Sequence, residues 1–175
     1  MINKTVFLSG ASSDIGTEVA RIYVHNGYRV LAHFLNGSER FEEFIAKHKE
    51  VATIRSDFSS VEGLDDFLTC HKKELEDCDV FVNAVGLLED ISYEAFSASD
   101  LVRSLTANTV SSVLISRLIG AAMSRRKWGR IVHLGSIGVK YGGGSNSYCY
   151  SLSKHALEFF PAEIRKWAQS NVFVN

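Results

Sequence analysis

The chain has 175 residues, of which 46% are hydrophobic and 22% charged, and its 19 Lys and Arg residues nearly balance its 20 Asp and Glu residues. This composition fits one folded domain with a sizeable core and excludes a disordered chain. The balanced charge gives no general electrostatic reason to bind nucleic acid or a membrane surface, and no apolar run approaches the roughly 20 residues that span a bilayer. Residues 1–4 pass directly into an expected strand without a signal-peptide pattern, so we expect a cytoplasmic protein.

Strand-like apolar runs alternate with amphipathic segments along the whole chain. The expected strands cover residues 5–9, 29–34, 51–54, 80–82, 130–134 and 172–174. The expected helices cover residues 15–26, 38–49, 61–74, 99–124 and 147–169. Because parallel neighbours need crossovers, the alternation predicts an α/β fold, a doubly wound parallel sheet with helices on both faces (Rossmann fold). The one proline, Pro161, falls inside the last expected helix and should bend it.

A glycine turn follows the first expected strand. It reads Ser-Gly-Ala-Ser-Ser-Asp-Ile-Gly over residues 9–16 and leads directly into a helix. A helix N-terminus offers unpaired N–H groups and partial positive charge, and glycine lets a pyrophosphate approach the backbone. Tight packing alone can also require glycine there. The turn lacks the Gly-Lys-Ser/Thr ending of a Walker-type phosphate loop, which argues against a phosphotransferase.

A second candidate site lies in the C-terminal half. Tyr150 and Lys154 are four residues apart in an expected helix, so their side chains share one face, and an ammonium beside a phenol favours the phenolate. Ser136 follows a buried strand at the end where such sheets place their ligands. Asn108 lies inside the long helix, where asparagine is mildly unfavourable. A solvated surface pair and a helix-bending asparagine are the alternative interpretations.

Cysteine and histidine spacing predicts neither a disulfide framework nor a metal site. The three cysteines lack a Cys-x-x-Cys pair and the six histidines are scattered. Cys149 lies next to the proposed chemistry, and a filler role is the simplest interpretation of it.

Taken in chain order, these motifs resemble the short-chain dehydrogenase/reductase family. The glycine turn resembles the family's Thr-Gly-x-x-x-Gly-x-Gly cofactor motif, Asp57 resembles its adenine-contacting aspartate, and residues 82–86 are similar to its Asn-Asn-Ala-Gly element. The resemblance implies a catalytic tetrad of Asn108, Ser136, Tyr150 and Lys154. It implies cofactor contacts at Ser9, Gly10, Ser12, Ser13, Asp14, Ile15, Gly16, His33, Asn36, Ser38, Asp57, Phe58, Asn83, Ala84, Val85, Gly86, Tyr150 and Lys154.

The reaction implied by the resemblance is hydride exchange between a nicotinamide cofactor and a carbonyl or secondary alcohol. Tyr150 would give or take the proton, and Lys154 would support Tyr150 and hold the nicotinamide ribose. Ser136 would steady the substrate oxygen, and Asn108 would support a water chain. Members that reduce 3-oxoacyl carrier-protein substrates are the nearest type, so an oxoacyl thioester or a small carbonyl compound is the expected substrate.

The segment after the second expected strand bears on which nicotinamide is used. An acidic residue normally reads the 2′-hydroxyl of NAD about 20 residues after the glycine turn, and residues 32–38 contain no acid. The absence favours NADP, with NAD still possible. His33, Asn36, Ser38 and Arg40 are the candidate phosphate partners, although each of them could simply begin a helix.

Two departures from the family motif motivate an alternative function. Asp14 replaces the central glycine of the cofactor turn, and it is harmless to binding if it caps the helix. Ala84 replaces the second asparagine of the fourth-strand element, which can brace neighbouring strands. A non-catalytic dinucleotide-binding sensor or partner subunit is therefore the alternative. A methyltransferase also begins with a glycine turn but leaves the tetrad unexplained.

The chain stops directly after the sixth expected strand, where family members usually continue through a substrate-binding loop, a helix and a seventh strand. We therefore expect residues 1–175 to form a single Rossmann-type dinucleotide-binding and catalytic domain that is C-terminally incomplete. The expected partners are a small-molecule carbonyl or alcohol substrate and further copies of the chain. Family resemblance suggests a homodimer or homotetramer packed through residues 99–124 and 147–169.

Overall fold

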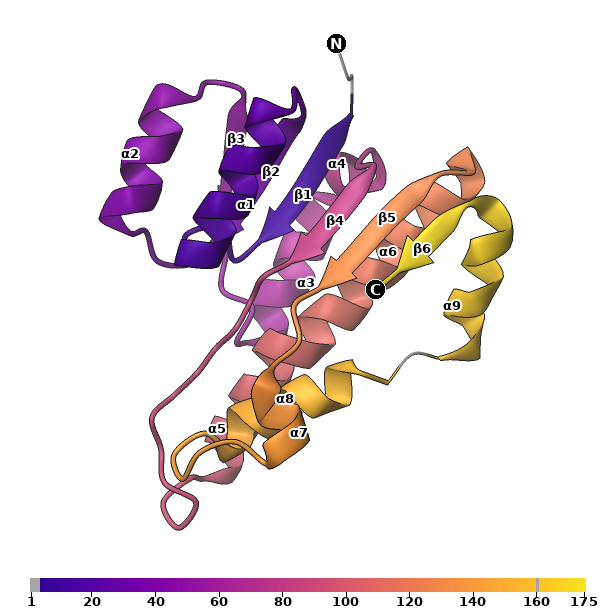
Figure 1. Ribbon diagram of the computed structural model, residues 1–175. Coiled ribbons are helices and arrows are strands. Elements are labelled where there is room, and N and C mark those ends of the chain that lie inside the picture. Colours follow the sequence, from indigo (N-terminus) through magenta and orange to yellow (C-terminus); the bar gives the residue numbers. More distant parts are fainter. Residues whose placement is uncertain (1–3, 160) are drawn as a thin grey trace.

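A computed structural model describes residues 4–159 and 161–175 of the chain. In this part, six strands form one parallel sheet in the order β3-β2-β1-β4-β5-β6 (Figure 1). The strands are β1 (Thr5–Ser9), β2 (Arg29–Phe34), β3 (Val51–Arg55), β4 (Val80–Asn83), β5 (Gly129–His133) and β6 (Val172–Val174). The predicted doubly wound α/β fold is confirmed. Residues 1–3, on which the signal-peptide expectation partly rested, lie outside the described residues.

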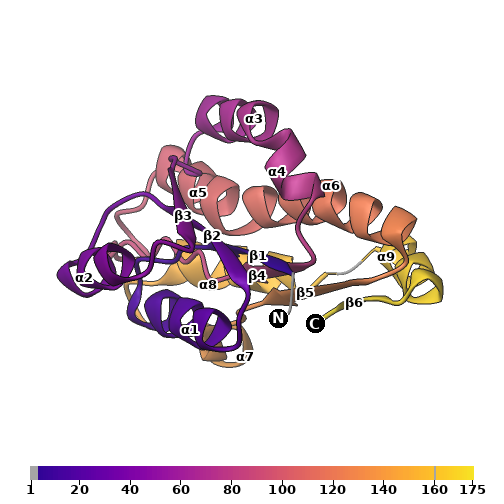
Figure 2. The same ribbon diagram turned by 90° about the horizontal axis from the view of Figure 1, so that it is seen from above.

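Helices cover both faces of this sheet (Figure 2). They are α1 (Asp14–His25), α2 (Glu39–Lys47), α3 (Val61–Cys70), α4 (Lys72–Glu76), α5 (Ala98–Leu105), α6 (Ser111–Arg126), α7 (Ile137–Tyr141), α8 (Tyr148–Leu157) and α9 (Ala162–Trp167). A π-helical segment, η1 (Thr106–Val110), joins α5 to α6, and a short 3-10 turn, η2 (Ala168–Ser170), follows α9.

Successive side chains along each strand point to alternate faces of the sheet, and they form two separate hydrophobic cores. Phe7 and Phe81 point to the face covered by α3, α4 and α6, where they stack with ring centres 5.3 Å apart. Their neighbours Val6 and Leu8 point to the opposite face and pack with α1 and α2. Successive strand side chains point to opposite faces, so a sheet buried on both sides requires the nearly continuous apolar runs seen in this sequence.

Two expected helices are each divided in the structure. In the expected helix 61–74, α3 ends at Cys70 and α4 begins at Lys72, and the expected helix 147–169 is divided into α8, α9 and η2. Pro161 does not bend a helix but precedes α9 with an extended backbone (φ −67°, ψ 153°). Proline is tolerated at a helix start because it has no N–H to contribute, and it disfavours helix in the residue before it. That residue, Phe160, lies outside the described residues.

The continuous helix Ala98–Arg126 bears on the expectation that no apolar run of the chain spans a bilayer. Among the described residues it is long and apolar enough, by length and composition alone, to cross a membrane. The apolar window is 56% buried within the protein, where Ile115, Ile119 and Met123 pack against the sheet. A core helix of a folded protein passes the same test, so this feature is weak evidence for a membrane span.

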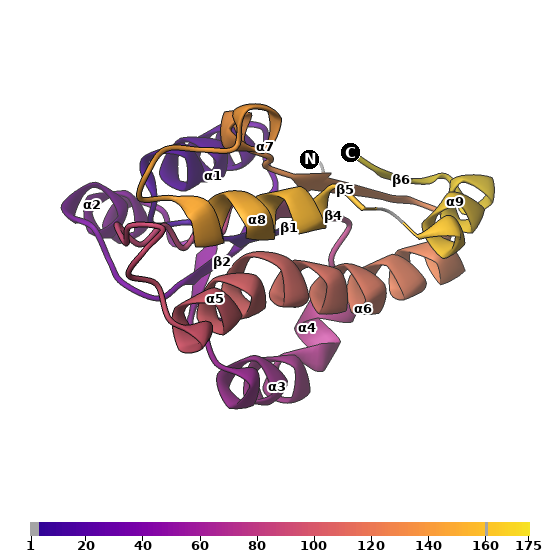
Figure 3. The same ribbon diagram turned by 90° about the horizontal axis from the view of Figure 1, so that it is seen from below.

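The carboxyl ends of β1, β4 and β5 all point toward α5, α7 and α8, as the arrowheads in Figure 1 and the view of Figure 3 show. Strand order reverses between β1 and β4, since β2 and β3 lie on one side and β5 and β6 on the other. Doubly wound sheets bind their ligands in the crevice at this point.

Candidate active site

The glycine turn lies directly at this crevice. Gly10 has a positive φ of 73°, and a Cβ built on it would lie 2.6 Å from the carbonyl oxygen of Ala84, so glycine is required there. Ser13 is the N-cap of α1, because its side chain accepts a hydrogen bond from the Gly16 N–H at 3.0 Å. Asp14 is therefore the first helical residue and not the cap that the sequence analysis considered. Its carboxylate is 93% exposed.

A row of polar side chains crosses the sheet just before the crevice. The register pairs Ser9 with His33 on one side and with Asn83 on the other, and Asn83 pairs in turn with His133. Ser9 Oγ donates to Asn83 Oδ1 at 2.8 Å, and Asn83 Nδ2 donates to Ser112 Oγ at 2.6 Å and contacts His133 Nδ1 at 3.3 Å. This polar row (Ser9, His33, Asn83, His133) ties the strand ends together, since buried polar groups are expensive unless they are paired.

His33 is a buried neutral imidazole that joins two walls of the crevice. Its Nδ1 accepts from the Gly10 N–H at 3.4 Å, so its Nε2–H donates to the Ser56 carbonyl at 3.0 Å. Its ring stacks on Phe58 with centres 3.8 Å apart and planes within 1°. Burial lowers the pKa of His33 to about 4. Both nitrogens are used and the ring is uncharged, so the geometry does not support His33 as a phosphate partner.

A cavity of about 620 Å³ opens at the crevice. This size fits a cofactor pocket, and the turn backbone at Gly10 lies on its wall. The predicted cofactor residues that line it are Gly10, Ser12, Ser13, Asp14, Ile15, His33, Asn36, Asp57, Phe58, Ala84, Val85 and Gly86. The predicted residues outside its lining are Ser9, Gly16, Ser38, Asn83, Tyr150 and Lys154.

Sequence reasoning missed several residues of this lining, namely Leu35, Ser56, Ser59, Leu87, Arg103, Ala107 and Leu134. Ser56 and Ser59 flank the predicted Asp57 and could have been included with it. Arg103 and Ala107 lie four residues apart on one helix face, but the sequence alone does not indicate that this face meets the cavity.

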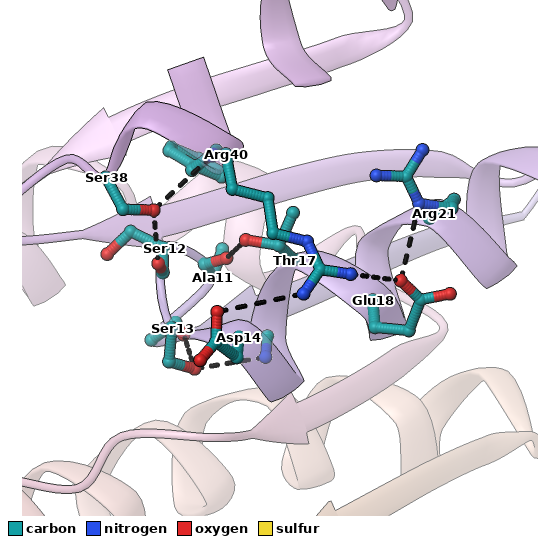
Figure 4. A network of polar contacts seen from close by, with 12 residues as sticks. Ala11, Ser12, Ser13, Asp14, Thr17, Glu18, Arg21, Ser38 and Arg40 are labelled. Atoms are coloured by element: carbon teal, nitrogen blue, oxygen red, sulfur yellow. Dashed lines mark hydrogen bonds and ion pairs between the residues drawn. The ribbon is translucent and has the colours of Figure 1, made fainter. Parts of the chain in front are cut away.

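The helix after β2 is connected to the glycine turn by polar contacts (Figure 4). Ser38 Oγ donates to the Ser12 carbonyl at 2.8 Å and caps α2 by accepting from the Phe41 N–H. Arg40 Nη2 lies 2.8 Å from Glu18 Oε2, and its Nη1 lies 3.7 Å from Asp14 Oδ1. Two of the candidate phosphate partners, Ser38 and Arg40, therefore contact the turn or α1 directly.

Lys154 is a buried ammonium at the catalytic end of the crevice. It is 2% exposed, and its Nζ donates to the Val85 carbonyl at 2.8 Å and to the Leu134 carbonyl at 3.0 Å. Burial lowers the pKa of Lys154 to about 8. Its Nζ lies 5.9 Å from the ring centre of Tyr150, and a Cβ on Gly86 would lie 3.7 Å from Tyr150 Cε2. Tyr150 and Lys154 thus both lie at the end of β4, beside the cavity.

Asn108 lies fully buried in η1 and connects three segments. Its Oδ1 accepts from the Leu87 N–H at 2.7 Å, while its Nδ2 donates to the Leu87 carbonyl at 3.1 Å and to Ser153 Oγ at 2.8 Å. The helix departs from α geometry at this residue, which fits the helix-bending interpretation. Through Leu87 and Ser153, Asn108 also fixes α8 relative to the chain that follows β4. A helix-bending role for Asn108 is therefore compatible with a place beside the candidate catalytic residues of α8.

Ser136 and Cys149 are both half-buried, and Cys149 directly precedes Tyr150 in α8. Ser136 precedes α7, a helix that the sequence analysis did not predict, and its Oγ accepts from the Gly138 N–H at 3.1 Å. Burial raises the pKa of the Cys149 thiol, which favours the unreactive protonated form.

The connection from β4 to α5, residues 84–97, runs over the catalytic end as a strap. Leu87 is held by Asn108, and Glu89 pairs with Arg103 at 3.1 Å. Farther along, the Ile91 N–H donates to the Asn146 carbonyl at 3.2 Å, beside the start of α8. The strap therefore connects the cavity wall, through Arg103, to the segment that carries Tyr150.

Comparison with known proteins decides the family. The family model described as short chain dehydrogenase matches residues 4–175. The chain belongs to this family. The fold agrees with solved members: the bulky-bulky ketone specific alcohol dehydrogenase from Comamonas testosteroni superposes over 100% of this chain and 72% of its own, with a TM-score of 0.86 at 18% identity. A metagenomic short-chain oxidoreductase in complex with NADP covers 98% of this chain and 79% of its own, with a TM-score of 0.81 at 23% identity.

The relatives in sequence are oxidoreductases. Acetoacetyl-CoA reductase of Cupriavidus necator is 26% identical over 100% of this chain and 73% of its own length. The 3-oxoacyl-[acyl-carrier-protein] reductase of Homo sapiens is 29% identical over 94% of this chain and 69% of its own. The NADP-dependent 3-hydroxy acid dehydrogenase of Schizosaccharomyces pombe is 28% identical over 93% of this chain and 65% of its own. The chain thus spans about two thirds of the length of these short-chain dehydrogenases.

Proposed function

We propose that this short-chain dehydrogenase is an NADP-dependent reductase of carbonyl compounds, with an oxoacyl thioester or a small ketone as substrate. The observation that carries the proposal is the position of Tyr150 and Lys154 against Val85 and Gly86, which line the same cavity as the glycine turn. A cofactor along this cavity would have its reactive end beside the tyrosine. The names of the sequence relatives support the same reaction class.

Four residues of the chain have separate roles in the proposed reaction. The cofactor, when bound, supplies the hydride, and the protein supplies placement and electrostatics. Tyr150 donates its hydroxyl proton to the substrate oxygen. Lys154 holds a positive charge close beneath it and stabilises the phenolate that remains. Ser136 donates a hydrogen bond to the same oxygen as charge develops there, and Asn108 holds α8 in register with the strap.

The proposed cofactor contacts follow the cavity. Gly10, Ser12 and Ser13 would meet the pyrophosphate, while Asp57 and Phe58 would meet the adenine. Near the 2′-position, Asn36 on the cavity wall and Arg40 beside it remain as phosphate partners, because His33 is neutral and Ser38 is occupied by its capping contacts. We further propose that residues 1–175 act as one cytoplasmic domain that binds cofactor and performs catalysis, and that the chain assembles as a homodimer or homotetramer.

The test is Tyr150→Phe. NADPH binding is followed by nucleotide fluorescence, and turnover by loss of NADPH absorbance with acetoacetyl-CoA and a panel of small ketones. We expect the variant to bind NADPH with the wild-type dissociation constant and to lose at least about a hundredfold in kcat. Tyr141→Phe is the matched control, because Tyr141 is 69% exposed in the adjacent segment.

Three results would separate the possibilities. Unchanged turnover in Tyr150→Phe would remove the assigned role of this tyrosine. NADPH binding without turnover of any carbonyl in the wild-type chain would favour the non-catalytic sensor or partner subunit. Absence of NADPH and NADH binding would contradict the cofactor assignment itself.

A further inference from the structure

The carboxylate of Asp14 lies on the cavity wall at the start of α1, where the family motif has a glycine. Its side chain is 93% exposed, so it carries charge into the solvent at the mouth of the cavity and packs against little of the protein. Its one ion pair among the described residues is with Arg40, at 3.7 Å. Asp14 is therefore positioned to act on the charge of a ligand more than on the stability of the fold.

Arg40 has two acidic neighbours, and the shorter contact is not the one with Asp14 (Figure 4). Glu18 Oε2 lies 2.8 Å from Arg40 Nη2 and also 3.4 Å from Arg21 Nε. Glu18 comes from the second turn of α1 and is half-exposed, as is Arg40. The guanidinium is thus oriented by Glu18, and Asp14 adds a second negative charge on the cavity side.

We propose that Asp14 is a specificity-determining residue that lowers the preference of this chain for NADP over NAD by competing for Arg40. This inference rests on the proposed function, in which Arg40 lies near the 2′-position. NADP differs from NAD only by the 2′-phosphate, so a charge that acts through Arg40 changes the two affinities unequally. Asp14 lies on the Nη1 side of the guanidinium, at 3.7 Å, and its pairing there leaves this side of Arg40 less available to the 2′-phosphate.

The expected change in the ratio of cofactor dissociation constants is small, because the Asp14–Arg40 ion pair is exposed to solvent. Exposed ion pairs contribute little, because water and salt screen them, and the loss of one corresponds to about a threefold change in a dissociation constant. Asp14 also lies near the glycine turn and the pyrophosphate, which NAD and NADP share. Any repulsion there weakens both cofactors equally and cancels in the ratio of their dissociation constants. The ratio therefore isolates the contribution of Arg40.

The experiment measures NADH and NADPH dissociation constants by fluorescence titration for the wild type and Asp14→Asn at low salt. Asparagine keeps the shape of the side chain and is accepted at a helix start. We expect the ratio of the NADH to the NADPH constant to rise about threefold, and the rise to shrink at high salt. Glu43→Gln is the matched control, because it removes another exposed carboxylate, 65% exposed and paired with Lys47, from the same helix as Arg40.

The same substitution is then made in an Arg40→Ala background. If Asp14 acts through Arg40, Asp14→Asn leaves the ratio unchanged in this background. An unchanged or lower ratio in the single variant overturns the inference, and so does an equal rise with and without Arg40. Circular dichroism checks that each variant is folded. Failure of the wild-type chain to bind either cofactor would instead contradict the proposed function, and the inference would fall with it.

Discussion

The two buried histidines of the polar row predict a specific acid sensitivity of the fold. Burial lowers the pKa of His33 to about 4, and burial together with the nearby Lys154 charge lowers the pKa of His133 to about 4, whereas histidine in an unfolded chain titrates near about 6.5. Between these values the unfolded state binds more protons than the folded state. The free energy of unfolding therefore falls as the pH falls from about 6.5 toward about 4.

The change in the free energy of unfolding with pH can be calculated from the difference between the folded and unfolded pKa values of each histidine. Between pH 7 and pH 5, one histidine with these two pKa values costs the folded state about 2 kcal/mol, and the pair costs about 4 kcal/mol. Such a loss is a large share of the roughly 5–15 kcal/mol that stabilises a typical domain. Urea unfolding at the two pH values, followed by the fluorescence of Trp128 and Trp167, measures it directly.

Substitutions assign the effect to each ring. His33→Gln and His133→Asn each lower stability at pH 7, because each breaks buried hydrogen bonds, but each also removes about half of the pH dependence. His155→Gln, at an exposed position of α8, is the matched control. A wild-type chain that is equally stable at pH 5 and pH 7 would refute the reasoning, as would an unchanged pH dependence in both variants.

Two further predictions concern packing and the strap. Gly120→Ala places a methyl 2.3 Å from the ring of Trp167, so we expect α9 to be displaced and the free energy of unfolding in urea to fall by about 2 kcal/mol. Gly135→Ala is its control, because no atom lies within 4 Å of the added methyl. Equal stability of the two variants would contradict this packing. Glu89→Gln removes the Arg103 pair that holds the strap, so we expect KM for the carbonyl substrate to rise about threefold with kcat nearly unchanged, and the double reversal Glu89→Arg with Arg103→Glu to restore it in steady-state assays. A fall in kcat alone would contradict a positioning role for this pair.

The central strands were predictable because both of their faces are apolar, whereas the order of the strands in the sheet was not predicted and comes from the structure. The runs at Phe7 and Phe81 have no polar interruption, which is the pattern of a parallel strand buried on two sides. Helix ends were less predictable. From the sequence, Pro161 can either bend one helix or begin a new one. The structure shows that it precedes α9, so it begins a new helix.

The candidate site was predictable where it consists of local motifs and not where it depends on distant contacts. Ser13 and Gly16 form a cap within one turn of chain, and a spacing of four residues places Tyr150 above Lys154. Arg103 reaches the cavity only because α5 crosses the strand ends, and no spacing near Arg103 indicates this. His33 looked like a cation near a phosphate, and its burial beneath Phe58 removes that charge.

The departure at Ala84 shows why a motif can lose a polar side chain without losing its geometry. The bracing of neighbouring strands is performed by Asn83, which binds Ser9 on β1 and Ser112 on α6. At position 84 the backbone alone meets Gly10, with the carbonyl only 2.6 Å from where a Cβ on Gly10 would lie, and the Ala84 N–H donates to the Ser9 carbonyl. The Ala84 side chain packs against the core cluster that includes Ala11 of the turn, so it adds an apolar contact where asparagine would add a polar one. The close approach of the glycine turn to β4 therefore survives this replacement, which leaves Asp14 as the departure for which we propose an effect on cofactor binding.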